Sequence, residues 1–575
     1  MYHLRFPFGK SISNVSARLQ TVPPEDISID ISIDELRRWI RSPGTLKEVD
    51  LPRIHQSIDR HEAHLRWLAH GINQVQMERT SGGGCCGLLR KADPSMLLKE
   101  ERERIDASLQ LRKSLLAPIR RLPPELLSEI FAHCLPNKRF VTPSPTSAPL
   151  FLGQVNALWR NIAISTPKLW SSMEISHELC KPDRLLPLME TWIARAKERP
   201  LSLSIKGGML SAETPQARWL VALFRQHTTR WQHLRFELPE DVLPIFMPPL
   251  SLPMLKTFEI YSLGGLTEAW VHDLSNVLCS ALRLHHFVWD NNVWQILPLR
   301  LLWSQLTRLT LNTAVSFDQC LTILGGSHAL THVSFQNVSV VGVSSHDPIS
   351  LPGLISFVIS TQEDTDNSLA FFLDLLTFSG LRELLLNCQV WPHKAVTSFL
   401  RRSRCPLESF NLFFPPVTET EIMECLEIVQ ATLEELTIQT DAGDSIEGVI
   451  TDCILDHLTA AGDNHHILCP NLQVIALYDC ISCTSGRYAK MIESRLDPGF
   501  HTPTMKVVEI YENEVELEKL KELRKQGLIL KIYSERTGEP LDLLPEEIAR
   551  LNKLREEGLV LRVYRPTGHF GEADD

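Results

Sequence analysis

Few residues in this chain combine the types and the spacing that catalysis requires. Gly82, Gly84 and Gly87 match the literal pattern G-x-G-x-x-G, which in dinucleotide-binding proteins follows a strand and opens a helix. Here the glycines follow a helical pattern instead, so they indicate a break between helices. The neighbouring Cys85 and Cys86 would need an adjacent base to act as nucleophiles, and the sequence assigns none to them.

Two groups of histidines and cysteines have the residue types of a metal site. In the first, His61 and His64 with Glu62 resemble a zinc-protease helix, but these histidines are three residues apart and that motif needs four. We therefore expect no metal at this position.

The second group is a cysteine-rich stretch near residue 480. Its possible ligands are Cys469, Cys480, Cys483, His465 and His466. Zinc binding is one interpretation. In the other, the segment from Leu472 follows L-x-x-L-x-L-x-x-C, where a buried cysteine replaces the asparagine of a leucine-rich repeat, and this explains Cys480 without a metal. We expect no catalytic residue, no metal site and no cofactor.

Length, charge and composition limit the function classes. At 575 residues the chain exceeds the size at which a single core stops growing, about 250–300 residues, so it holds several units or one elongated unit. The net charge of −11 argues against a general nucleic-acid binder, and no apolar run of about 18 residues predicts a membrane span. The 13 scattered cysteines are typical of a reducing compartment. We expect a cytoplasmic or nuclear protein without nucleic acid or membrane among its partners.

The elements that could position a site begin with a helical arm over residues 31–117, after a flexible N-terminus of residues 1–30. Its first part repeats with spacings of four and three, as in a coiled-coil seam. The seam residues are Ile54, Ile58, His61, Leu65, Leu68, Ile72 and Val75. Pro94, behind Asp93, starts a second helix. The arm is either an antiparallel hairpin or a broken helix, with residues 80–95 as an insertion between its parts.

The C-terminal part of the chain repeats the pattern L-x-x-L-x-L with apolar substitutes. The eleven starts are Trp231, Leu255, Leu284, Leu306, Leu330, Leu354, Leu381, Leu407, Leu433, Leu472 and Met505. Most successive starts lie 22–29 residues apart, within the range of leucine-rich repeats. Each such unit pairs a strand with a return helix, and neither buries its apolar face until neighbours stack.

The repeats predict an α/β fold in which residues 173–575 form a degenerate leucine-rich-repeat horseshoe. Return helices are expected near residues 370–378 and 421–430, and an early strand at residues 200–205. The asparagine ladder is mostly missing, because Ala314 and Gln389 stand at ladder positions. By the period-two rule, residues between the buried leucines face solvent. We expect target recognition at Arg308, Thr310, Glu383 and Leu385.

The tail contains a second, shorter repeat. Residues 522–538 match residues 553–568, and Gly527 corresponds to Gly558. Each copy predicts a charged helix, a glycine cap and an apolar strand. The copies would extend or cap the horseshoe, and their charged faces are either solvated surface or a partner-binding edge.

Residues 118–172 predict a small all-α module. Pro123 and Pro124 start a helix that continues through Phe131, and a second amphipathic helix runs from Val155 to Pro167. About fifty residues are near the lower size limit for an independent core, so part of this apolar surface should meet another surface. That surface is either a partner protein or the following domain of the same chain, for which the helices would be an internal cap.

This module resembles the F-box, in a version common in large families of mushroom-forming fungi. The resemblance rests on LPPELLSEIF and VNALWRNIA, and two features depart from it: a longer proline-rich loop between the helices, and Asn156-Ala157-Leu158, where the family usually has a cysteine and basic residues. It implies that the module docks onto a Skp-family adaptor, which links to a cullin scaffold. The implied contact residues are Leu122, Pro123, Pro124, Leu126, Ile130, Phe131, Val155 and Trp159.

The resemblance implies a non-enzymatic subunit of a Skp-cullin-F-box ubiquitin ligase. Such a subunit binds the adaptor through its F-box and an unknown target protein through its repeats, and partner subunits transfer ubiquitin. Two alternatives stay open, namely a leucine-rich-repeat scaffold or inhibitor without ligase function, and an enzyme with an unrecognised site.

Overall fold

We describe the protein from a computed structural model. The described residues are 31–41, 48–81, 94–176, 182–207, 211–239, 241–246, 251–262, 267–291, 299–339, 346–361, 367–413, 415–440, 449–459, 467–478, 480–484, 486–496, 505–511 and 529–533. The chain divides into two compact units, which we call the helical unit and the α/β unit. The helical unit comprises Met1–Pro136, Pro143–Trp170 and Arg195–Lys197, and the α/β unit Asn137–Thr142, Ser171–Ala194 and Glu198–Asp575.

The helical unit contains the arm and the small module. Its elements are α2 (Ile33–Arg41), α3 (Leu51–Ser81), α4 (Pro94–Leu116), η2 (Pro118–Arg121), α5 (Pro124–His133), α6 (Leu152–Val155), α7 (Ala157–Ser165) and η3 (Pro167–Trp170). Within the described helices, none combines the length and the apolar composition needed to cross a membrane.

The arm is an antiparallel hairpin of α3 and α4. The start of α3 shares a buried cluster with the end of α4, through Ile54 and Leu115. The later part of α3 shares another with the beginning of α4, through Ile72 and Leu98. Apolar residues of the predicted seam therefore pack against α4 of the same chain. The predicted N-terminus of residues 1–30 and most of the insertion lie outside the described residues.

The predicted second helix of the module is two helices. Asn156 has an extended backbone, with φ −161° and ψ 176°, so α6 ends at Val155 and α7 begins at Ala157. The Asn156 side chain caps α7 by accepting a hydrogen bond from the Trp159 backbone N–H at 2.9 Å. The single-helix prediction was wrong because an apolar period of 3.6 also fits two helices joined at a cap.

The α/β unit is built on one parallel sheet. In the described residues it has 14 strands: β1 (Ser172–Ser176), β2 (Leu201–Lys206), β3 (Trp231–Glu237), β4 (Thr257–Ser262), β5 (His286–Asn291), β6 (Arg308–Ser316), β7 (His332–Ser339), β9 (Ser356–Thr361), β11 (Glu383–Asn387), β12 (Ser409–Phe413), β13 (Glu435–Gln439), β14 (Val474–Tyr478), β15 (Val507–Tyr511) and β16 (Ile529–Tyr533). Their spatial order follows the chain. A separate two-stranded sheet pairs β8 (Ile349–Ser350) with β10 (Leu376–Thr377).

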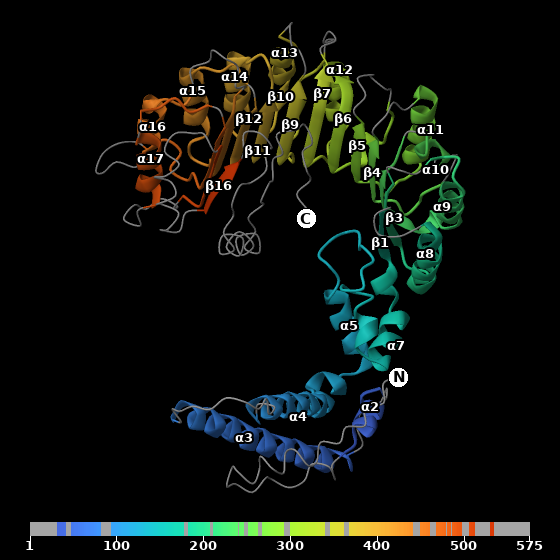
Figure 1. Ribbon diagram of the computed structural model, residues 1–575. Helices are drawn as coiled ribbons and strands as arrows, with labels where there is room; N and C mark the ends of the chain where they lie inside the picture. The colour runs from blue at the N-terminus through green and yellow to red at the C-terminus, as the bar shows by residue number, and fades with distance from the viewer. Residues whose placement is uncertain are drawn as a thin grey trace. The chain divides into compact units, whose positions relative to one another are not determined.

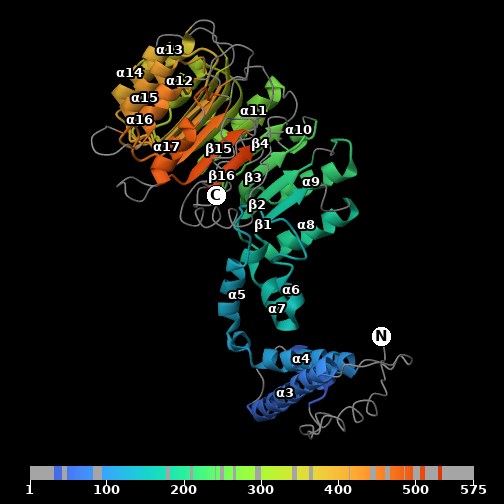
Figure 2. The same cartoon turned by 60° about the vertical axis from the view of Figure 1, so that its left-hand side comes forward.

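Helices connect successive strands and lie on the outer side of the curved sheet (Figures 1 and 2). They are α8 (Pro182–Ala196), α9 (Pro215–Gln226), α10 (Leu243–Phe246), α11 (Glu268–Cys279), α12 (Phe317–Gly325), α13 (Ser368–Asp374), α14 (His393–Ser403), α15 (Glu419–Val429), α16 (Asp452–Leu458) and α17 (Arg487–Leu496), with the 3-10 turns η4 (Thr228–Arg230) and η5 (Trp303–Gln305). Capping boxes start α12 at Ser316 and α15 at Thr418. The mixed α/β class predicted from the sequence is confirmed.

The sequence pattern explains where the strands form. All eleven pattern starts are buried, from Trp231 to Met505, and a described strand begins at or two residues after each of them. The expected early strand is β2, and the first tail copy contributes β16, which pairs with β15. The second tail copy lies outside the described residues. The burial of apolar side chains against the outer helices thus determines where each strand forms.

Candidate binding surfaces

The small module exposes apolar side chains on α5, around α6 and on α7. Leu126 and Ile130, one turn apart on α5, are 53% and 40% exposed. Phe151 and Val155, at the start and end of α6, are 49% and 46% exposed. We call these four residues, two on α5 and two around α6, the exposed apolar residues of the module. Apolar side chains paired in this way on a small module are typical of a surface that binds another protein.

The other predicted contact residues have different positions. Phe131 is fully buried, and its ring packs 4.8 Å from that of the partly buried Trp159, so this pair holds α5 against α7. Pro123 and Pro124 are exposed at the start of α5, and Leu122 just before them is half-buried. Phe131 therefore supports the module from inside, whereas Leu126, Ile130 and Val155 are accessible.

The inner, concave face of the sheet carries two rows of side chains. If each pattern start is position 1, positions 4 and 6 are buried against the helices, and positions 3 and 5 lie on the concave face. Position 3 holds His233, Thr257, His286, Arg308, His332, Ser356, Glu383, Ser409, Glu435 and Val474. Position 5 holds Arg235, Glu259, Val288, Thr310, Ser334, Val358, Leu385, Asn411, Thr437 and Ala476.

A hollow of about 260 Å³ opens on this face between β3 and β9. We call it the basic hollow. Its lining residues are Lys138, Arg139, Arg235, Glu259, His286, Arg308, Leu309, Thr310, His332, Val333, Ser334, Ser356 and Val358. Four cationic side chains face one carboxylate, a formal excess of three positive charges. The structure thus brings two predicted recognition residues, Arg308 and Thr310, into one basic site.

One wall of the hollow is the segment Asn137–Thr142, which lies between α5 and α6 in the sequence and belongs to the α/β unit. Its Val141 carbonyl accepts a hydrogen bond from Glu174 N at 2.8 Å. Arg139 pairs with the fully buried carboxylate of Glu259 at 2.9 Å, and Arg235 pairs with the same carboxylate. A buried carboxylate needs such partners to offset its desolvation. The segment is therefore anchored on the sheet through Glu259.

His286, which lines the hollow, and His233, at position 3 of β3, are neutral at physiological pH. Burial, and after it the positive charges of Arg139 and Arg308, lower the pKa of His286 to about 3. Burial, followed by Arg139 and Lys256, lowers the pKa of His233 to about 4. His286 therefore adds no positive charge to that of Lys138 and the three lining arginines.

The second half of the concave face differs from the prediction. Leu385, expected to face solvent, is 3% exposed, and its neighbours in position 5, Asn411 and Thr437, are fully buried. Glu383 is partly exposed but lies outside the lining of the basic hollow. The prediction for Leu385 was wrong because strand periodicity determines which face a side chain is on, whereas exposure also depends on what packs over that face.

The candidate metal residues have structural partners. Cys480 and Cys469 are fully buried, and their Sγ atoms donate hydrogen bonds to the carbonyls of Ile438 and Leu426. Burial raises the pKa of Cys469 to about 12, so it stays a thiol. His465 and His466 lie outside the described residues, as do the glycines and cysteines of residues 82–87. Among the described residues, no three His, Cys, Asp or Glu side chains are arranged to hold a metal.

The histidine pair of the arm also has structural contacts. The His61 Nδ1 atom lies 2.8 Å from the Ser57 carbonyl, and Glu62 pairs with Lys113 across the hairpin at 2.7 Å. The buried Arg112 donates to the Ser57 hydroxyl and to the Ile31 carbonyl. These polar groups therefore join α3 and α4.

Several residues of the basic hollow were missed from the sequence. His286 and His332 occupy position 3 of the motifs beside that of Arg308, so an alignment of the eleven motifs at this position would have revealed the cluster. Lys138 and Arg139 lie outside the repeat motifs and carry no such signal, and the ion pair of Arg139 with Glu259 spans 120 positions of the sequence.

Comparisons with known proteins give no family for this chain: no protein-family model matches it, and no curated protein matches it.

Proposed function

We propose that this chain is the substrate-recognition subunit of a Skp-cullin-F-box type ubiquitin ligase. In this proposal the small helical module binds a Skp-family adaptor, and the α/β unit, as a degenerate leucine-rich-repeat horseshoe, binds a target protein on its concave face. The chain itself is not catalytic, because its role is to raise the concentration of target lysines near the ubiquitin carrier.

The observation that carries the proposal is the exposure of the apolar residues of the module. Leu126, Ile130 and Val155, on the two segments whose sequence resembles the F-box, and Phe151, just before α6, are each at least 40% exposed. Burying a side chain of this size in an interface is worth about 1.5–3 kcal/mol. Four such residues supply much of the free energy of a specific interface.

The horseshoe assignment is supported by strand order and burial together. Successive parallel strands pair in chain order, and the eleven motif starts between them are buried. This is the arrangement that stacked strand–helix repeats need to bury a continuous core. A concave face of this kind is a common site of protein recognition.

The charge of the basic hollow indicates the kind of target. Arg308 and Lys138 line it with Arg139 and Arg235, against the single carboxylate of Glu259. Because excess positive charge favours negatively charged partners, we propose that the target offers an acidic segment to strands β6, β7 and β9.

Adaptor binding is tested with an exposed-residue variant. The double variant Leu126→Asp/Ile130→Asp replaces two side chains that are exposed in the native chain. The module should therefore still fold, and pull-down of a Skp-family adaptor should be lost. Phe131 is unsuitable for this test because it is buried in the module. The matched control is Phe371→Asp, whose side chain is 62% exposed on the α/β unit. An adaptor that binds the folded double variant as well as the control would exclude ligase assembly through these residues.

Target binding is tested separately with a fluorescent hexaglutamate peptide as the probe. Arg308→Glu should weaken binding about tenfold or more at low salt, because it removes a positive charge and adds a repulsive one. The control Arg401→Glu changes the charge by the same amount at an exposed position on α14. Equal losses in both variants would mean that the peptide responds to overall charge and not to the hollow.

A further inference from the structure

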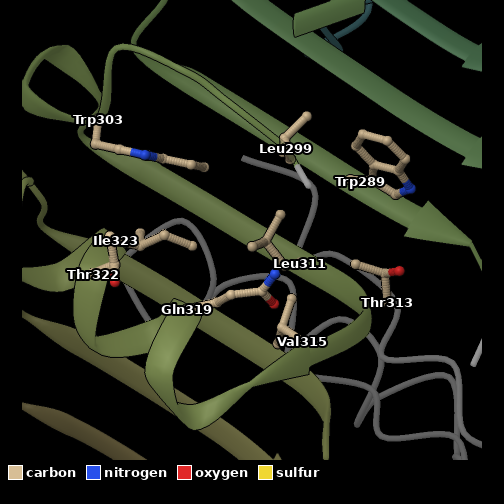
Figure 3. Close-up of a pocket in the computed structure, with 9 residues that line it drawn as sticks. All are labelled: Trp289, Leu299, Trp303, Leu311, Thr313, Val315, Gln319, Thr322 and Ile323. Carbon is tan, nitrogen blue, oxygen red and sulfur yellow. The ribbon is translucent and has the colours of Figure 1, made fainter. Parts of the chain in front are cut away.

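A second hollow lies on the opposite, helix-facing side of the sheet. It encloses about 120 Å³ near the C-terminal ends of β5 and β6. Its lining residues are Trp289, Leu299, Trp303, Leu311, Thr313, Val315, Gln319, Thr322 and Ile323. Figure 3 shows Trp303 and Trp289 on opposite sides, with Leu311 between them. The nine described residues that line it include no charged side chain, so the hollow suits an uncharged molecule.

Two of the lining residues, Trp289 and Thr313, carry buried polar atoms without a hydrogen-bond partner in the described part of the chain, and so does Asn291, two residues after Trp289 on β5. Trp289, Thr313 and Asn291 are 1%, 7% and 0% exposed. The Trp289 indole N–H, the Thr313 hydroxyl and both amide atoms of Asn291 have no hydrogen-bond partner in the described part of the chain. Buried polar groups in folded proteins are nearly always paired, with protein, water or ligand. Several unpaired groups in one place therefore indicate a missing polar partner.

These groups belong to one face of two neighbouring strands. Trp289 pairs in register with Leu311, and Asn291 and Thr313 each lie two residues further along, so all four side chains share the helix-facing side. The pairing of β6 with β7 shifts register between Asn312 and Val315, which places Thr313 in an irregular stretch. Such irregularities often occur beside binding sites, because they re-aim a side chain.

The α12 side of the hollow supplies a further polar group. The Gln319 side-chain oxygen accepts a hydrogen bond from Ser316 N at 3.0 Å as part of the capping box. This contact holds the side chain, and its amide nitrogen turns toward Leu311 in Figure 3. The hollow therefore combines aromatic walls with fixed polar groups, the usual composition of a small-molecule site.

We propose that this hollow binds a small, uncharged aromatic molecule that carries a hydrogen-bonding carbonyl or amide group. The ring packs against Leu311 on the side open to Trp303 and Trp289, and the polar group meets Trp289 Nε1 and Thr313, beside Asn291. The hollow of about 120 Å³ is somewhat smaller than a dry engineered cavity of about 150 Å³ that holds benzene, so it limits the ligand to a single ring. The inference is independent of ligase function, since it concerns a different face of the sheet from the basic hollow.

The test uses three probes of nearly equal shape: benzamide, cumene, which lacks the polar group, and benzoate, which is charged. The full-length chain is labelled with 5-fluorotryptophan, and the ¹⁹F resonances are assigned by single Trp→Phe changes. We expect benzamide to shift the Trp289 and Trp303 resonances saturably. Its affinity should exceed that of cumene and of benzoate by about tenfold, because sites built around buried polar groups reject ligands that cannot pair with them.

Two variants identify which groups select the ligand. Thr313→Val with Asn291→Leu should reduce the benzamide preference over cumene to about one, and Thr313→Val alone is measured if the double variant does not fold. Trp303→Ala should weaken the binding of both benzamide and cumene.

The control is the resonance of Trp192, which is buried against Ser172 in another part of the unit and should not move. The proposal is overturned if benzamide shows no saturable shift, if cumene binds equally well, or if Trp192 shifts in parallel.

Discussion

The concave face of the sheet has two halves that share one sequence pattern and differ in what they can bind. From β3 to β9, position 3 is occupied by His233, His286, Arg308 and His332 with two short hydroxyl residues, and the face opens into the basic hollow. From β11 to β14 the same position holds Glu383, Ser409, Glu435 and Val474. There, position 5 is buried from Leu385 to Ala476.

The difference shows that the repeat motif determines the core of each strand and leaves the chemistry of the concave face free. Positions 4 and 6 are apolar and buried in both halves, as at Leu309 and Leu384. Positions 3 and 5 vary from cationic through neutral to acidic, because they make no contact with the helices that set the fold. Recognition can therefore change along the sheet without a change in architecture.

The largest expected effect concerns the anchor of the basic half. Glu259→Ala removes the partner of both Arg139 and Arg235, and loss of one member of a buried ion pair costs about 3–5 kcal/mol. The free energy of unfolding, measured with urea, should fall by this amount. The control is Glu408→Ala, whose pair with Arg382 is exposed and should contribute about 0–1 kcal/mol. Similar losses for the two variants would contradict the anchoring role of Glu259.

A second test compares position 5 in the two halves directly. Leu385→Ala removes a buried side chain and should lower the free energy of unfolding by about 2–3 kcal/mol. Thr310→Ala, at the same position in the open half and partly exposed, should cost less than about 0.5 kcal/mol. Thermal unfolding of both variants and of the native chain in the same buffer measures the two losses of unfolding free energy. If Leu385→Ala also costs little, the second half of the face is open in solution.

The smallest expected effect is a pH dependence that arises in the basic half. In the unfolded chain His286 and His233 bind protons below about pH 6.5, but in the fold their pKa values are about 3 and 4. Between these limits the unfolded chain binds more protons, so lowering the pH from 7 to 5 should reduce the free energy of unfolding. The contribution is about 1 kcal/mol for each histidine, after allowance for their partial exposure.

This pH dependence should be smaller in His286→Asn than in the native chain. The control is His328→Asn, at an exposed position, which should keep the native dependence. Melting temperatures at pH 7 and pH 5 provide the comparison, and an identical shift in all three proteins would exclude His286 as its source.

Several features of the fold were predictable because they depend on neighbours in the sequence. The eleven motif starts, the strand β2 and the helix α15 follow from local apolar periodicity, whereas the helix expected at residues 370–378 ends at Asp374 and is followed by β10. The apolar seam required a partner helix but left a hairpin and a broken helix open, and the packing of α3 against α4 shows the hairpin. The helix break at Asn156 was missed because a cap and an interior polar residue look alike in a periodic pattern.

The sequence alone determined which side chains enter the core, since a strand or helix must bury its apolar positions wherever it lies. It also identified Arg308 and Thr310 as concave-face residues. Only the tertiary structure decided which of these positions are open, because that depends on segments distant in the chain. The ion pair of Arg139 with Glu259 joins residues 120 positions apart. Contacts of that range leave no periodic trace in the sequence, and they determine where the basic hollow forms.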